Sequence, residues 1–75
     1  MKRVGEVVRT AQWLAVVRSP DDGYPDLGTE AVDQNLDVVG RVVDVFGPVD
    51  RPYVAVSPVD RVVLAGLLGE KLYTR

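Results

Sequence analysis

The chain has 75 residues, of which 47% are hydrophobic, and its nine Lys and Arg against eleven Asp and Glu give a formal net charge of −2. This length predicts a single domain, residues 1–75, near the lower limit for a self-sufficient core. Cysteine and histidine are both absent, which excludes disulfides, thiolate or imidazole metal sites, and Ser-His or Cys-His nucleophile pairs. We therefore expect a protein without enzyme chemistry, metal or cofactor.

Membrane insertion and secretion are not expected. No apolar run approaches the roughly 20 residues of a membrane span, and Glu6 and Arg9 interrupt the segment where a signal peptide would have its apolar core. The sequence thus predicts a cytoplasmic protein. Its mildly acidic balance also argues against unaided nucleic-acid binding, because the sequence shows no basic face that would displace counterions from phosphates.

The first two predicted strands cover residues 4–10 and 13–18. The chain contains seventeen valines and no isoleucine, and this β-branched composition favours strands over helices. The short link Ala11-Gln12 predicts a hairpin, although it lacks the Asn-Gly chemistry that tight turns prefer.

Residues 19–30, SPDDGYPDLGTE, predict a surface loop, because two prolines, two glycines and four acids interrupt any regular element. Asp21 and Asp22 are adjacent, so the acids do not follow the alternating spacing of an EF-hand. We expect a solvated acidic loop rather than a calcium site. Residues 31–35 then predict a short, weak strand.

Residues 37–46 admit two interpretations. Asp37, Arg41 and Asp44 recur with the spacing of an amphipathic helix, but five valines and the central Gly40 disfavour a helix. We therefore predict a strand. Its apolar residues do not alternate, so either a bulge at Gly40 shifts their phase or both faces of the strand are covered.

A β-hairpin is predicted where this strand is followed by residues 53–57. The two strands are joined by the six-residue loop Gly47-Pro48-Val49-Asp50-Arg51-Pro52, and such a connection is typical of a hairpin with a longer loop. The flanking strands carry no polar group suited to chemistry, and the loop, with two prolines and a glycine, is rigid and suits surface contact better than catalysis. Val49 has little structural reason to lie at the loop tip unless a partner covers it.

The C-terminal part is less regular. In residues 59–68, Asp60 is a candidate cap for a single helical turn that ends near Gly66 and turns Val62, Val63 and Leu67 to the core. Residues 70–74 predict a last short strand. Five or six short strands with little helix predict an all-β fold, a small β-barrel.

The chain has five aromatic residues, and we assign most of them to the core because they are not interleaved with basic residues. A minimal RNA-binding β-barrel remains an alternative, since aromatic rings on a barrel surface stack on bases. The residues are Trp13, Tyr24, Phe46, Tyr53 and Tyr73.

The central hairpin resembles a known family. The run Gly40-Arg-Val-Val-Asp44-Val-Phe46-Gly47-Pro48-Val49, followed by Pro52-Tyr53-Val-Ala-Val56, closely resembles the signature of the Gar family of H/ACA ribonucleoprotein subunits. The segments Arg3-Val-Gly5-Glu-Val7 and Gly69-Glu-Lys-Leu72-Tyr73 resemble that family's first and last strands. The similarity therefore covers nearly the whole chain.

This resemblance implies a six-stranded closed β-barrel of the translation-factor type that acts as a non-catalytic regulatory subunit. It implies binding to the dyskerin-type pseudouridine synthase, with the H/ACA guide RNA reached only indirectly through the complex. It further implies that the subunit promotes substrate RNA loading and turnover in guide-directed rRNA pseudouridylation and ribosome biogenesis, by favouring one of two loop states of the synthase. The absence of glycine-arginine-rich tails predicts an archaeal-type core.

The resemblance also implies which residues contact the partner. For Phe46 and Tyr53 a place in the barrel core is the alternative, and for Gly47 and Pro48 the alternative is that they only shape the turn. The implied partner-binding residues are Phe46, Gly47, Pro48, Val49, Pro52 and Tyr53.

Two further hypotheses remain open. The opening Val4-Gly5-Glu6-Val7 and the valine-rich strands are also similar to a PRC-type ribosome-maturation barrel. An uncovered strand edge or the apolar loop predicts a weak homo-oligomer when the chain is isolated.

Overall fold

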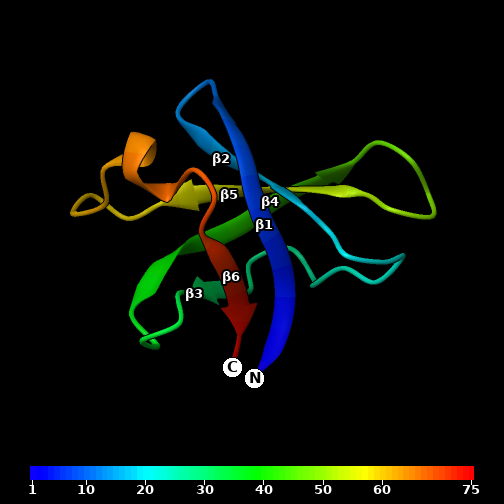
Figure 1. The fold of residues 1–75 in the computed structure, drawn as a ribbon, viewed down its shortest axis with the longest axis horizontal. Helices are drawn as coiled ribbons and strands as arrows, with labels where there is room; N and C mark the ends of the chain where they lie inside the picture. The colour runs from blue at the N-terminus through cyan, green and yellow to red at the C-terminus, as the bar shows by residue number, and fades with distance from the viewer.

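A computed structural model describes all 75 residues and shows six β-strands and one short 3-10 helix (Figure 1). The all-β prediction is confirmed, and the helical interpretation of residues 37–46 is excluded. No helix of the chain is long and apolar enough to cross a membrane. The elements are β1 (Lys2–Ala11), β2 (Leu14–Arg18), β3 (Glu30–Val32), β4 (Val38–Phe46), β5 (Tyr53–Pro58), η1 (Leu64–Leu67) and β6 (Lys71–Thr74).

The six strands form a closed antiparallel barrel in the order β1-β2-β5-β4-β3-β6. β6 closes the barrel by pairing with both β1 and β3, and its register pairing with β3 is limited to Val32 and Tyr73. Closure removes the edge strands of an open sheet. Of the two predicted causes of self-association, only the apolar loop remains.

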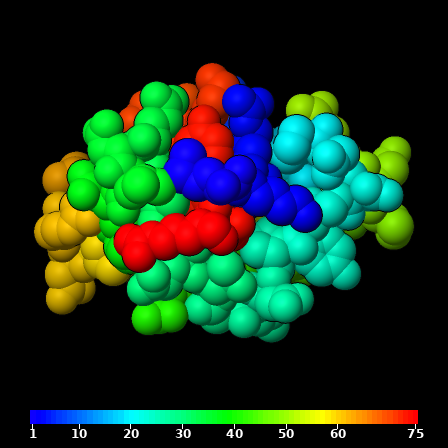
Figure 2. Space-filling model, turned by 90° about the horizontal axis from the view of Figure 1, so that it is seen from below, coloured from blue at the N-terminus to red at the C-terminus, as the bar shows by residue number.

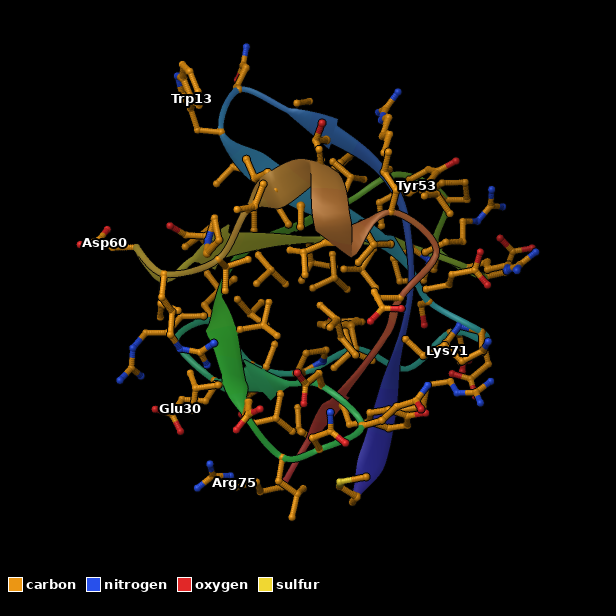
Figure 3. All side chains as sticks on the ribbon, turned by 60° about the vertical axis from the view of Figure 1, so that its left-hand side comes forward. Trp13, Glu30, Tyr53, Asp60, Lys71 and Arg75 are labelled. Atoms are coloured by element: carbon orange, nitrogen blue, oxygen red, sulfur yellow. The ribbon has the colours of Figure 1, made fainter.

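The barrel interior is filled by aliphatic side chains (Figure 3). Val7, Val17, Val54 and Val45 form one inward row across four neighbouring strands. Even an eight-stranded barrel has an interior just wide enough for side chains, so this narrower one is packed with valine, alanine and leucine.

The prediction that most aromatic residues lie in the core is therefore wrong. The exposed fractions of Trp13, Tyr24 and Phe46 are 86%, 59% and 38%. Tyr53 and Tyr73 are half-buried and lie outside the core cluster. The narrow interior leaves no room for these rings, so they lie on the outer wall and in the loops.

Two bulges explain why the apolar residues of β4 do not alternate. Val39 has no partner on β3, and Val43 has none on β5. The predicted bulge at Gly40 is thus correct in kind, but the shifts occur one residue before it and three residues after it. Val43 is 45% exposed, so the alternative that both faces of β4 are covered is wrong.

Gly40 instead allows the backbones of β4 and β5 to pack closely. It lies against the carbonyl group of Ser57 on β5, and a Cβ atom at this position would overlap that carbonyl oxygen. The strand therefore tolerates no side chain here.

The first hairpin turn and β3 differ from the predictions by a few residues. The turn consists of Gln12 and Trp13, not Ala11 and Gln12. β3 ends at Val32, because the Asp33 carboxylate accepts hydrogen bonds from the backbone N–H groups of Asn35 and Asp37 and forms a turn there.

The segment 59–68 contains a helical turn, but not the one predicted. The 3-10 helix Leu64–Leu67 begins after an extended Val63 and has no side-chain cap, so Asp60 does not cap it. Leu67 is buried and Val62 packs against the core as predicted, whereas Val63 is 74% exposed. The helix starts too late in the segment to turn Val63 inward.

Candidate functional site

The loop between β4 and β5 extends away from the barrel at one end of its long axis (Figure 1). A shallow hollow of about 250 Å³ lies on this loop. Five of the six predicted partner-binding residues line it, and only Tyr53 does not. We define the β4–β5 loop surface as the residues that line this hollow: Tyr24, Val45, Phe46, Gly47, Pro48, Val49 and Pro52.

Val49 lies at the tip of this surface and is 91% exposed. The Arg51 N–H donates to the Pro48 carbonyl oxygen at 3.3 Å and closes a turn around it. Pro48 and Pro52 further stiffen the loop, because each proline fixes its own φ. A rigid turn thus holds an aliphatic side chain in solvent, where it contributes nothing to the core.

Gly47 has a structural requirement of its own. Its φ is +90°, in the region that side chains disfavour, and an added Cβ would lie 2.8 Å from Cδ2 of Tyr53. Glycine therefore lets the chain leave β4 close to the Tyr53 ring. The shape of the turn therefore requires glycine at position 47 whether or not a partner protein binds there.

A network centred on Ser19 holds the loop surface in place. Ser19 is fully buried, its N–H donates to the Pro52 carbonyl oxygen at 3.0 Å, and its own carbonyl oxygen accepts from Arg51 Nε at 3.0 Å. Its hydroxyl lies 2.8 and 2.7 Å from the carbonyl oxygens of Asp21 and Gly23. The start of the 19–30 loop is thereby hydrogen-bonded to Arg51 and Pro52 at the end of the β4–β5 loop.

This attachment places Tyr24 in the hollow, a residue that sequence reasoning did not select. Tyr24 is 59% exposed and belongs to the loop predicted to be only solvated and acidic. No local pattern in the sequence signals its position, since that depends on hydrogen bonds between segments about thirty residues apart.

Tyr53 lies on the outer wall of the barrel and contacts arginines. Its hydroxyl accepts a hydrogen bond from Arg18 Nη1 at 2.9 Å. The guanidinium carbons of Arg18 and Arg9 lie 4.9 and 5.9 Å from the ring centroid, within the range of cation–π attraction. On its other side Tyr53 stacks on Phe46, with centroids 5.6 Å apart and an angle of 23° between the planes. The alternative that places Phe46 and Tyr53 in the barrel core is therefore wrong.

Arg9, Arg18, Tyr53 and Phe46 together form what we call the basic–aromatic cluster. Arg18, Tyr53 and Phe46 lie side by side in one register row across β2, β5 and β4. Neither arginine is in an ion pair, because the chain's one salt bridge joins Arg41 and Glu30. Guanidinium groups beside flat rings suit contact with nucleic-acid phosphates and bases. Sequence reasoning selected Phe46 and Tyr53 but missed the two arginines, because the pairing of β1, β2, β5 and β4 brings these residues together.

The chain was also compared with known proteins. No curated protein sequence is significantly similar to it. The family described as the Gar1/Naf1 RNA binding region matches it over residues 1–75. This match favours the Gar family over the PRC-type alternative and supports an RNA-binding, non-catalytic accessory role in the H/ACA ribonucleoprotein. The chain therefore belongs to the Gar1/Naf1 RNA-binding-region family.

Proposed function

We propose that this chain is a regulatory subunit that docks on the dyskerin-type pseudouridine synthase through the β4–β5 loop surface. In the cytoplasm it would promote substrate RNA loading and turnover in guide-directed rRNA pseudouridylation and so contribute to ribosome biogenesis. Membership of the Gar1/Naf1 family supports this proposal. The observation that carries it is Val49, 91% exposed beside a hollow lined mostly by apolar residues.

The chemistry of the surface suits docking. Its hollow is lined by aliphatic, proline and aromatic groups without a charged residue, as in the centre of protein interfaces, and the exposed Asp50 and Arg51 follow Val49 at its rim. The loop is held in one conformation by the Ser19 network, so little ordering entropy is lost on binding. Such a subunit promotes turnover without chemistry of its own, provided that it contacts one conformation of the synthase better than another.

RNA enters this proposal through the complex. The net charge of −2 gives the isolated chain little electrostatic attraction for phosphates. The basic–aromatic cluster offers two guanidinium groups that are in no ion pair. Two phosphate contacts are few beside the roughly six to ten that give a nucleic-acid-binding protein a strong salt-dependent affinity. We therefore assign the placement of guide and substrate RNA to the synthase, with this subunit bound beside them.

The test is a calorimetric titration of the synthase with wild-type chain and with Val49→Asp. Because the substitution puts a charge at the centre of an apolar contact, we expect binding to weaken by about 2 kcal/mol or more, roughly thirtyfold. Stimulation of multiple-turnover pseudouridylation should fall in parallel at limiting subunit.

The matched control is Leu36→Asp, the same change of charge at an apolar loop residue that is 51% exposed and outside the β4–β5 loop surface. It should bind the synthase as the wild type does. Equal affinity of wild type and Val49→Asp would refute the proposed interface.

A further inference from the structure

The β1–β2 hairpin ends in an unusual turn. Gln12 and Trp13 both have positive φ, 52° and 68°. Turns of this kind favour asparagine and glycine, since a bulky side chain clashes with its own backbone in the left-handed conformation. Trp13 nevertheless occupies the second position and is 86% exposed. It therefore neither favours the turn nor fills the core.

Trp13 stands between two hollows on the same side of the barrel. Thr10, Trp13, Leu64 and Ala65 are among the residues that line the first. Trp13, Pro58, Asp60 and Leu64 are among those that line the second. Figure 3 shows Trp13 projecting from the hairpin tip, with Asp60 on the same side of the molecule. We call Trp13, Pro58, Asp60, Leu64 and Ala65 the Trp13 surface.

This surface is separate from the β4–β5 loop surface. The two share no residue. Figure 1 shows η1 and the β4–β5 loop at opposite ends of the long axis. A partner that covers Val49 therefore leaves the Trp13 surface open.

We propose that the Trp13 surface binds a short peptide segment of another protein, with one apolar side chain in each hollow and a Lys or Arg opposite Asp60. Asp60 is the only ionisable residue that lines either hollow, and it is in no ion pair. Its neighbour Arg61 donates instead to the Val38 carbonyl oxygen. An unpaired carboxylate beside apolar hollows favours a cationic partner and repels an anionic one such as RNA.

A second copy of this chain fits the surface less well. A symmetric dimer places the same patch on both sides, so two unpaired Asp60 carboxylates would enter one small interface. A standard dimer interface buries about 800 Å² per partner, whereas Trp13 is the one exposed large apolar side chain among the residues that line the two hollows. A short peptide with one apolar side chain for each hollow needs no larger apolar surface than this.

The experiment uses a displayed library of random dodecapeptides, selected on wild-type chain and counter-selected on Trp13→Gly. We expect enrichment of peptides with two large apolar residues and a Lys or Arg. A synthetic copy of the most enriched peptide should bind Trp13→Gly and Asp60→Lys at least tenfold more weakly than wild type. Trp13→Gly should remain folded, because glycine favours the positive φ at this position.

Leu36→Gly is the matched control, since Leu36 also has a φ of 68° and is 51% exposed. It should bind the peptide as wild type does, and so should Val49→Asp. Four results would overturn the proposal: no peptide enriched over Trp13→Gly, enrichment of acidic peptides, equal loss in Leu36→Gly, or a wild-type dimer in sedimentation that Trp13→Gly abolishes. Each leaves the proposed docking at Val49 intact, because that is measured with the synthase.

Discussion

Single atoms decide several features of this barrel. At Gly40 the carbonyl group of Ser57 takes the space in which a side chain would begin. At Gly47 the Tyr53 ring does the same, and at Val49 nothing covers the side chain at all. The first two residues serve the fold and the third has no role in it. Gly40 and Gly47 are therefore explained by the backbone of the fold, whereas Val49 is the residue that we assign to partner contact.

Gly40→Ala should destabilise the barrel strongly. The added methyl group would overlap the Ser57 carbonyl oxygen, and moving β4 from β5 costs about 2–3 kcal/mol, as in overpacked cores. In a domain of this size that loss lowers the melting temperature by roughly 10 °C or more. Thermal unfolding followed by circular dichroism measures it.

The control for this prediction is Gly66→Ala in η1, where an added Cβ meets nothing within 4 Å. Its melting temperature should stay close to that of the wild type. A similar, small change in both variants would show that β4 and β5 tolerate a wider spacing than the structure has.

At the scale of elements, the site depends on a link between two loops. The 19–30 loop and the β4–β5 loop are far apart in sequence, and Ser19 joins them through its backbone bonds to Pro52 and Arg51. Its hydroxyl then holds the carbonyl groups of Asp21 and Gly23. The position of Tyr24 in the hollow follows from this arrangement.

Ser19→Ala should loosen the loop while the barrel stays folded. The carbonyl groups of Asp21 and Gly23 lose the hydroxyl partner that the buried Ser19 gives them, at a cost of about 1 kcal/mol. Amide hydrogen exchange should accelerate at residues 21–24, and affinity for the synthase should fall less than in Val49→Asp.

The turn at residues 33–37, which depends on Asp33, provides an internal reference in the same experiment. Its exchange should not change. Unaltered exchange at residues 21–24 would show that the backbone bonds of Ser19 alone hold the loop.

At the scale of the whole molecule, the barrel is a compact body of 32 × 26 × 21 Å. The space-filling view in Figure 2 shows both chain termini gathered on one face, beside the 19–30 and 33–37 loops. The β4–β5 loop surface, the basic–aromatic cluster and the Trp13 surface are built from loops or outer walls. The valine core supports all three, and Val45, which packs against the core, also lines the hollow of the β4–β5 loop surface.

Local patterns predicted much of this structure. The valine-rich runs, the Gly/Pro loop and the missing α-helix follow from composition and turn chemistry, and the hairpin at residues 38–58 was placed within one or two residues. Features that depend on register were not predictable in this way. The convergence of Arg9 and Arg18 on Tyr53 requires the pairing of β1, β2 and β5, and the outward position of the aromatic rings requires the barrel width. The position of Tyr24 in the hollow depends on the hydrogen bonds of Ser19, which join segments far apart in the sequence.

The central claim, that Val49 and its loop dock on the synthase, is tested most directly by methyl NMR of the chain with isotopically labelled valines, titrated with unlabelled synthase. The exposed reporters are Val49 at 91%, Val63 at 74%, and Val8 and Val43 at 45% each, while the buried valines report whether the barrel stays intact. The account predicts that the Val49 methyl signals shift or broaden most, and that those of Val63 at the opposite end change little. Unperturbed Val49 signals, with the largest changes at Val63 or Val8, would contradict it.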